Sequence, residues 1–273
     1  MFLYAKEMDF LLIGSTSNLY IKNTTDIPIV ISTLKCNRYQ IEENQLLTEC
    51  GVQVSTLSRQ MITQGIKGFE YLTKLPGTIG ASIYNNSSVI SDENSITSLL
   101  VDVKVITPSG IRWLKKEDLH LSFRSSDLKK KIIRGVILQA RLKVEYDDVE
   151  KMKAIANANE LLRNKILEGP AHNLGCTVHR MFCKGRMPAR YRIPLMLYVK
   201  AISLITKDDN KVRSLKKRFL LIISGHRRLI PYVSSKQLII FLWRKEEADK
   251  YFDEYIKFMN DVCMTDQVEI EVI

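Results

Sequence analysis

Glycine is scarce in this chain, which has 12 glycines among 273 residues, whereas proteins average about 7%. No run of 18 apolar residues occurs, so we expect no membrane-spanning segment. The five cysteines are an odd number and form no CxxC pair, which favours a reduced, cytoplasmic protein. The opening residues lack a basic stretch before a long apolar core, so we expect no signal peptide.

The net charge of +11 is concentrated in one segment. Residues 180–228 contain 14 lysines and arginines against two acids, and the rest of the chain is close to neutral. Three interpretations fit this segment: a solvated helical face, a site for phosphate-bearing ligands, and a surface for nucleic acid or anionic lipid. Within it, the apolar stretch 193–199 followed by Lys200 also suits an amphipathic helix that lies on a surface.

The composition, 45% hydrophobic and 26% charged, is that of a globular protein. Hydrophobic periodicity predicts an α+β fold without internal repeats, with an irregular segment at 170–187 and a domain boundary near 165–170. We expect helices at 53–64, 147–166, 190–206, 210–220 and 245–262, and a short one within 68–80 that runs into a Pro-Gly turn. Strands are expected at 9–13, 19–21, 27–32, 39–41, 46–48, 98–106, 131–146, 237–243 and 267–273.

Two glycine-containing turns are candidate phosphate sites. The first, Gly14-Ser15-Thr16-Ser17-Asn18, follows the strand expected at 9–13, and the second is Gly77-Thr78-Ile79-Gly80. Exposed backbone N–H groups in such turns bind a pyrophosphate without any cation. Taken singly, each turn could equally be an ordinary connection between a strand and a helix.

Six segments in the same order resemble the UDP-N-acetylenolpyruvoylglucosamine reductase family. Two of them are the glycine turns, and a third is Glu117–Ser126, which is similar to the family's Glu-Asp-x-x-Phe-x-Tyr-Arg-x-Ser segment. The others are Leu174-Gly175-Cys176-Thr177-Val178, then Gly225-His226-Arg227 with Val233-Ser234-Ser235-Lys236, and Glu271-Val272. The resemblance implies an FAD-binding domain of the vanillyl-alcohol-oxidase-like type at 1–167. It also implies a smaller α+β substrate domain at 168–273, which contains the basic helical segment 180–228.

The resemblance implies a chemistry as well. In the family, NADPH reduces the flavin, and the flavin then reduces an enolpyruvyl ether carried on UDP-N-acetylglucosamine. A proton is delivered to the adjacent carbon. By this resemblance Arg124 stabilises the enolate-like charge, Cys176 stands where the family has a serine proton donor, and Glu271 assists from the opposite side.

Each of these residues has a plainer interpretation. Arg124 is equally a surface cation beside Asp127, and Glu271 a solvent-facing strand residue. Cys176 is equally a small buried hydrophobe, as most free cysteines are. For FAD, the resemblance assigns the backbone and side chains of the two turns, namely Gly14, Ser15, Thr16, Ser17, Asn18, Gly77, Thr78, Ile79 and Gly80.

Four residues of types that bind zinc lie close together in the sequence. His172, Cys176, His179 and Cys183 fall within 12 residues. Structural zinc sites usually bring two ligand pairs together across a longer loop. Since these four residues share one compact segment that the resemblance assigns to the active-site loop, no metal is predicted.

The sequence departs from the family where FAD is expected. Only eight residues precede the first strand, where the family has a further βαβ portion that helps cover the adenine side of FAD. Ser15 and Thr16 replace two glycines of the first turn, and Ala81 replaces one of the second. Where these positions need a positive φ or a close backbone approach, the side chains are expected to obstruct the cofactor.

The leading hypothesis is a cytoplasmic, FAD-dependent oxidoreductase that uses NADPH to make UDP-N-acetylmuramate for peptidoglycan, and so serves cell-wall synthesis, cell shape and division. The basic segment would face the phosphates of the UDP-sugar or NADPH. One alternative is a flavoprotein that acts on another UDP-sugar in surface-polysaccharide synthesis. The other is a binding protein that has lost flavin and uses segment 180–228 to contact a partner, nucleic acid or an anionic membrane.

Overall fold

The computed structural model describes residues 8, 10–21, 29–89, 91–167, 173–178, 187–243, 247–264 and 270–272. The chain forms two compact units. The first comprises Met1–Ser17 and Thr24–Arg163, and the second comprises Asn18–Asn23 and Asn164–Ile273. The chain therefore enters the second unit briefly, returns to the first, and re-enters the second within its long helix α4, Val149–Ile166.

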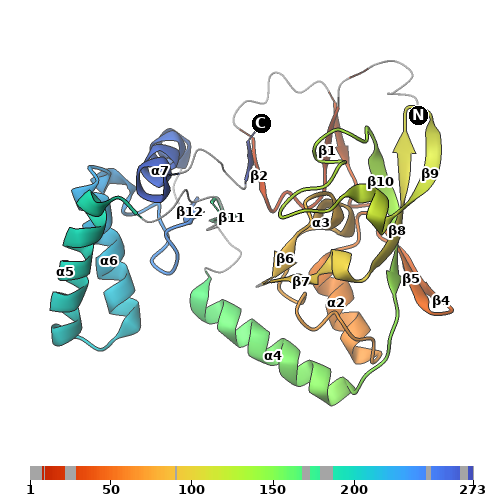
Figure 1. Cartoon of the computed structure of the whole chain (residues 1–273), viewed down its shortest axis with the longest axis horizontal. Helices are drawn as coiled ribbons and strands as arrows, with labels where there is room; N and C mark the ends of the chain where they lie inside the picture. The colour runs from red at the N-terminus through yellow and green to blue at the C-terminus, as the bar shows by residue number, and fades with distance from the viewer. Residues whose placement is uncertain are drawn as a thin grey trace. The chain divides into compact units, whose positions relative to one another are not determined.

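An antiparallel five-stranded sheet forms the centre of the first unit (Figure 1). Hydrophobic residues alternate along its strands, so one face is buried and pleating places every second side chain in the core. The strand order is β4 (Tyr39–Glu42), β5 (Gln45–Glu49), β10 (Val136–Lys143), β8 (Leu100–Thr107) and β9 (Gly110–Lys115). These strands confirm the expectations at 39–41, 46–48, 98–106 and 131–146.

Two helices of the first unit pack into the same core. Helix α2, Val54–Thr63, buries Val54, Leu57 and Met61, and it ends just before Gly65, whose φ of +79° suits a glycine at a helix end. Helix α3, Ile79–Tyr84, contacts β5 and β10. The short helix expected before the Pro-Gly turn is wrong, because that segment is a series of turns, and the helix begins after Gly77 instead.

Smaller elements complete the first unit. Strands β1 (Leu11–Ile13) and β3 (Val30–Ser32) pair in parallel. The remaining pieces are β6 (Ser88–Val89), β7 (Ser91–Ser95), and two short 3₁₀ helices, η1 (Ile96–Ser98) and η2 (Lys116–Leu119). Gly51 packs closely against the segment that follows β3: a Cβ placed there would lie 1.9 Å from the carbonyl oxygen of Thr33, so no other residue fits.

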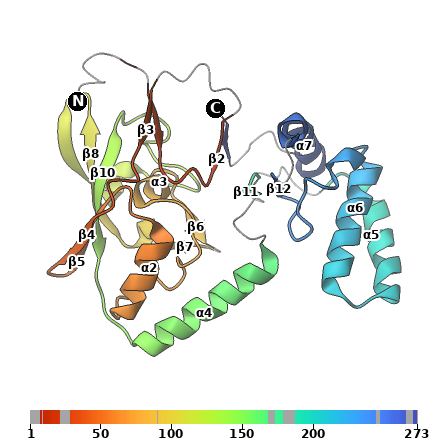
Figure 2. The same ribbon diagram turned by 180° about the vertical axis from the view of Figure 1, so that it is seen from behind.

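Among its described residues, the second unit combines three helices with two short strand pairs (Figure 2). Helix α7, Ala248–Cys263, buries one aromatic face against the core and carries Phe252, Tyr255 and Phe258 on it. The other helices are α5 (Ala189–Ile205) and α6 (Asp209–Ile223), followed by the 3₁₀ turn η4 (Arg227–Leu229). The strand pairs are β11 (Asn173–Cys176) with β12 (Ile240–Leu242), and β2 (Leu19–Tyr20) with β13 (Glu271–Val272).

These elements make the fold α+β, as predicted. Strand β11 corrects one expectation, because it lies inside the segment 170–187 that was predicted to be irregular. Throughout the described ranges, no helix is both long and apolar enough to cross a membrane.

Candidate functional site

The first predicted turn leaves strand β1 and adopts an unusual backbone conformation. Thr16 has a φ of +53°, in the left-handed region that a β-branched residue rarely occupies. Its hydroxyl donates a hydrogen bond to the carbonyl of Ser15 at 2.8 Å. Thr16 thus has a positive φ at a position where the resembled family has glycine, whereas Ser15 does not.

The second predicted turn is hydrogen-bonded to the connection between strand β5 and helix α2. Gly77 has a φ of +106°, and its carbonyl accepts a hydrogen bond from Val54 at 3.1 Å. The N–H of Ile79 donates to Val52, and the N–H of Gly80 donates to Cys50. Because these two amides already bind protein carbonyls, they are not free to bind a phosphate in this conformation.

The two turns lie against each other, although 60 residues separate them in the sequence. A Cβ built on Gly14 would lie 2.7 Å from Oγ1 of Thr78. A Cβ built on Gly77 would lie 3.5 Å from Oγ of Ser17. The closeness at Gly14 explains the glycine there, because any side chain would collide with Thr78.

Several polar groups at this junction have no partner among the described residues. The hydroxyl oxygen of Ser15 is buried and makes no hydrogen bond with the described part of the chain. Likewise, no acceptor within that part binds the N–H groups of Ser15, Thr16, Ser17, Gly77 and Thr78. Of these groups the Ser15 hydroxyl is buried, and buried polar groups are normally paired. An acceptor-rich ligand such as a pyrophosphate fits this set of donors.

Ala81 also stands where the resembled family has a glycine, but its backbone does not have a positive φ. It lies within helix α3, where alanine is the most favourable residue. Gly80, by contrast, is needed for packing, since a Cβ there would lie 2.9 Å from Cβ of Cys50. Of the replaced glycines, Thr16 is therefore the one whose backbone conformation disfavours a side chain.

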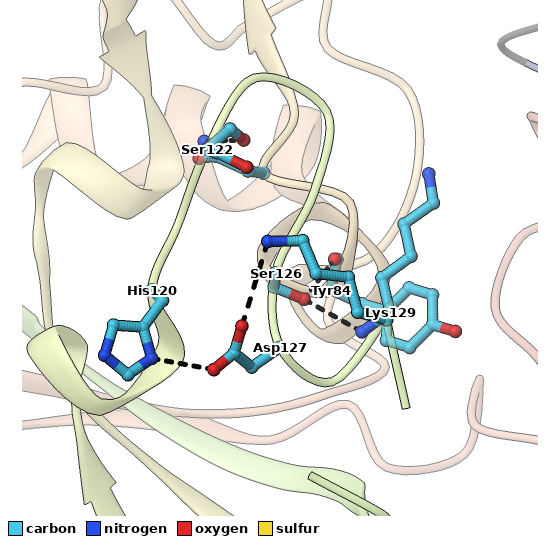
Figure 3. A network of polar contacts seen from close by, with 8 residues as sticks. Tyr84, His120, Ser122, Ser126, Asp127 and Lys129 are labelled. Atoms are coloured by element: carbon cyan, nitrogen blue, oxygen red, sulfur yellow. Dashed lines mark hydrogen bonds and ion pairs between the residues drawn. The ribbon is translucent and has the colours of Figure 1, made fainter. Parts of the chain in front are cut away.

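Arg124 lies in the tight loop between Ser122 and Ser126. A hydrogen bond from Ser126 to Tyr84 ties this loop to the end of helix α3 (Figure 3). Ser122 and Ser125 exchange two backbone hydrogen bonds of 3.0 Å, and Arg124 between them has a φ of +51°. Lys129 donates from Nζ to the carbonyl of Arg124 at 3.2 Å and to Oδ1 of Asn85 at 2.7 Å. The loop and the second turn are thus attached to opposite ends of one short helix.

The same network involves residues for which no function was predicted from the sequence. The hydroxyl of Ser126 donates to the carbonyl of Tyr84 at 2.7 Å and accepts the N–H of Lys129 at 3.1 Å. Asp127 binds Nδ1 of His120 at 2.7 Å and Nζ of Lys130 at 3.9 Å (Figure 3). The sequence signal for this loop is Ser126 itself, since serine hydroxyls often bind a backbone N–H a few residues further on.

Cys176 lies at the end of strand β11 in the second unit. It pairs with Ile240 of β12, and the preceding Gly175 has a φ of +74°. The next residue, Thr177, is buried, and its hydroxyl lies 2.6 Å from the hydroxyl of Tyr255. Cys176 itself is half-buried, so the plainer interpretation of a fully buried small hydrophobe is not what the structure shows.

Glu271 begins strand β13, whose backbone pairs in parallel with β2. In this register Glu271 lies opposite Leu19, which directly follows Asn18, the last residue of the first turn. Its side chain lies outside the described atoms.

The three predicted catalytic residues are divided between the two units. Arg124 belongs to the first unit, whereas Cys176 and Glu271 belong to the second.

Four candidate zinc ligands and a basic segment were also singled out from the sequence. Of the four residues considered for zinc, Cys176 alone is described, and the described residues contain no cluster that could hold a metal ion. In the basic segment, Lys217 is buried and donates to the carbonyls of Ile230 and Val233 at 3.2 and 2.9 Å. Lys217 therefore stabilises the second unit internally and does not contribute to a charged surface.

The chain is similar in sequence to known proteins. Residues 2–115 match the family model of an FAD binding domain. UDP-N-acetylenolpyruvoylglucosamine reductase of Caldicellulosiruptor saccharolyticus is 29% identical over 150 residues, which are 55% of this chain and 47% of that protein. The enzyme of the same name from Clostridium tetani is 30% identical over 140 residues, which are 51% and 44%.

A solved structure shares the fold. The crystal structure of UDP-N-acetylenolpyruvylglucosamine reductase from Thermus caldophilus matches with a TM-score of 0.67 at 13% identity, over 96% of this chain and 85% of that one. The chain spans about half the length of the curated relatives that it matches. The chain is therefore similar in sequence to part of the UDP-N-acetylenolpyruvoylglucosamine reductases, and it shares the fold of one of them.

Proposed function

We propose that the chain is an FAD-dependent reductase that oxidises NADPH and reduces UDP-N-acetylglucosamine enolpyruvate to UDP-N-acetylmuramate. The observation that carries this proposal is the meeting of the two glycine turns, with a set of amide donors and the buried Ser15 hydroxyl at their junction. A cytoplasmic location and a role in peptidoglycan synthesis follow from that substrate.

The pyrophosphate of FAD would bind at the junction of the turns. The N–H groups of Ser15, Thr16 and Ser17 supply donors from the first turn, and those of Gly77 and Thr78 supply them from the second. Helix α3 has only six residues, so the backbone amides matter more here than its dipole. Asn18, Ile79 and Gly80 would complete the edge of the site without donating from the amides that Ile79 and Gly80 already use.

The bound flavin would supply the hydride for the enolpyruvyl double bond. Arg124 would stabilise the negative charge that spreads onto the substrate carboxylate, because a guanidinium is always charged and binds carboxylates with two N–H groups. Lys129 holds the carbonyl of Arg124 and so fixes this loop. Cys176 would donate a proton to the adjacent carbon, and Glu271 would assist this transfer.

The absorption spectrum of the purified protein tests the cofactor. Flavin absorbance in the visible range, in roughly equal amount to the chain, is the expected result. Oxidation of NADPH on adding the UDP-enolpyruvyl substrate then tests the reaction. Protein with flavin that does not respond to this substrate would favour another UDP-sugar, and protein that takes up no flavin would favour a binding role.

The proton donor has its own test. We expect Cys176→Ala to bind FAD and to be reduced by NADPH at the normal rate, yet to turn over at least about 100-fold more slowly, because general-acid catalysis contributes 10²–10⁴-fold. Cys176→Ser is the matched control, since serine is the residue of the resembled family, and it should retain most of the activity. Equal loss of flavin reduction and turnover in Cys176→Ala would remove this role.

A further inference from the structure

Helix α5 in the second unit has two apolar faces, of which only one is packed. On the inner face Leu195 and Ile202 are buried, each 6% exposed. Tyr198 on this side stacks on Phe219 of α6, with ring centroids 4.1 Å apart. Both views show α5 and α6 side by side as a helical hairpin (Figures 1 and 2). The inner face is therefore fully accounted for by the fold.

The other apolar face of α5 is open to solvent. It consists of large aliphatic side chains at helical spacing, which we call the outer stripe: Ile193, Met196, Leu197 and Leu204, with Ile205 at its end. Leu204 and Ile205 are 89% and 84% exposed, and the other three are 50% to 59% exposed. Residues at i, i+3, i+4 and i+11 share one side of a helix, so these side chains line one side of α5.

The charge on helix α5 itself has one sign. Helix α5 contains no acidic residue in its 17 positions, and its cations Arg190, Arg192 and Lys200 are exposed. Lys200 lies within the stripe itself, seven residues after Ile193. Beyond the helix, the exposed Lys207 and Lys211 flank two exposed acids, Asp209 and Asp208, the second of which caps α6. The partner of this face must therefore accept aliphatic side chains and carry negative charge.

We propose that the outer stripe of α5 docks on an anionic lipid surface. An apolar face flanked by lysines and arginines is the composition of helices that lie in the membrane interface, where aliphatic side chains enter the acyl region and the cations meet lipid phosphates. A second copy of the chain fits less well, because it would bring the same cations against themselves. Nucleic acid fits less well because the stripe is aliphatic and offers no ring for base stacking.

Sedimentation of the purified full chain with lipid vesicles tests this proposal, with or without flavin. We expect binding to vesicles of equal parts phosphatidylglycerol and phosphatidylcholine. Vesicles of phosphatidylcholine alone should retain little protein, and added salt should release the bound chain. Leu197→Gln/Leu204→Gln should weaken binding about tenfold or more. Arg192→Gln/Lys200→Gln should weaken it about 25-fold, since each cation near the surface contributes about fivefold.

Matched variants in the first unit control for bulk hydrophobicity and net charge. Ile111→Gln/Ile132→Gln removes two exposed aliphatic side chains, and Lys35→Gln/Lys143→Gln removes two exposed cations. Both should bind vesicles like the parent chain. All four variants alter exposed positions, so unchanged thermal unfolding shows that each is folded.

Three results would overturn the proposal. One is vesicle binding that the α5 variants leave unchanged. Another is a dimer in solution that Leu197→Gln/Leu204→Gln dissociates while no vesicle binding occurs. The third is retention on DNA that falls with Arg192→Gln/Lys200→Gln but not with Leu197→Gln/Leu204→Gln, again without vesicle binding.

Discussion

Single residues decide how well the first turn suits a cofactor. Thr16 has a φ of +53°, and such a conformation costs of the order of 1–3 kcal/mol in a residue other than glycine. Its left-handed conformation could be anticipated only from the glycine of the resembled family, because threonine itself favours extended backbone. Ser15 was assigned by resemblance too, and nothing in its own sequence context indicated that its hydroxyl would be buried.

We expect Thr16→Gly to raise the free energy of unfolding by about 1 kcal/mol, because relief of the backbone strain outweighs the lost hydrogen bond to Ser15. It should also tighten binding of FAD. Ser17→Gly is the control, since Ser17 is in the same turn without a positive φ, and it should be neutral or destabilising. Thermal unfolding measures the stability of the two variants, and flavin titration measures their affinity for FAD. Equal destabilisation by the two variants would contradict backbone strain at Thr16.

At the scale of elements, periodic segments were predicted well and the connections between them were not. Helices α2, α4, α5, α6 and α7 appear where apolar residues recur every three or four positions. Helix α3 was missed because its sequence after Gly77 resembles a loop, and it forms where Ile79 and Ile83 can enter the core. The contact between the two turns depends on residues far apart in the chain, so local patterns cannot reveal it.

A double-mutant experiment tests this contact between turns. Gly14→Ala should destabilise the protein by about 1–3 kcal/mol, because its Cβ would lie 2.7 Å from Oγ1 of Thr78. Adding Thr78→Ala removes the colliding atom and should recover part of that loss, so the two effects will not add. Urea unfolding of the single and double variants measures the coupling. Strictly additive effects would show that the turns do not touch.

Across the whole molecule, several buried acidic groups are held in their neutral forms. Burial raises the pKa of the Cys50 thiol to about 12 in the first unit. In the second unit, burial raises the pKa of the Tyr255 and Tyr20 hydroxyls, and a hydrogen bond to Asp249 adds to the effect on Tyr20. None of these shifts was predicted from sequence, since burial depends on the complete fold.

These shifts predict an alkaline loss of stability. Above about pH 9, the ordinary range for a thiol, Cys50 ionises in the unfolded chain while the folded chain keeps its proton. The folded state then binds more protons than the unfolded state, so the free energy of unfolding falls as the pH rises towards 12. Chemical unfolding at pH 8 to 11 measures the slope. The buried hydroxyl of Tyr255 contributes to this slope in the same way. Tyr255→Phe removes that ionisable group and should make the free energy of unfolding less dependent on pH, and an unchanged slope would contradict this assignment.

The pairing of β2 with β13 has a consequence for how this protein can be divided. Tyr20 is 6% exposed in the core of the second unit, with its ring 4.4 Å from that of Phe252. A gene fragment encoding residues 164–273 would therefore lack one of its own core aromatic side chains. The second unit therefore cannot be exchanged between proteins as one continuous segment. Any exchange must also carry strand β2, which follows the first turn in the sequence.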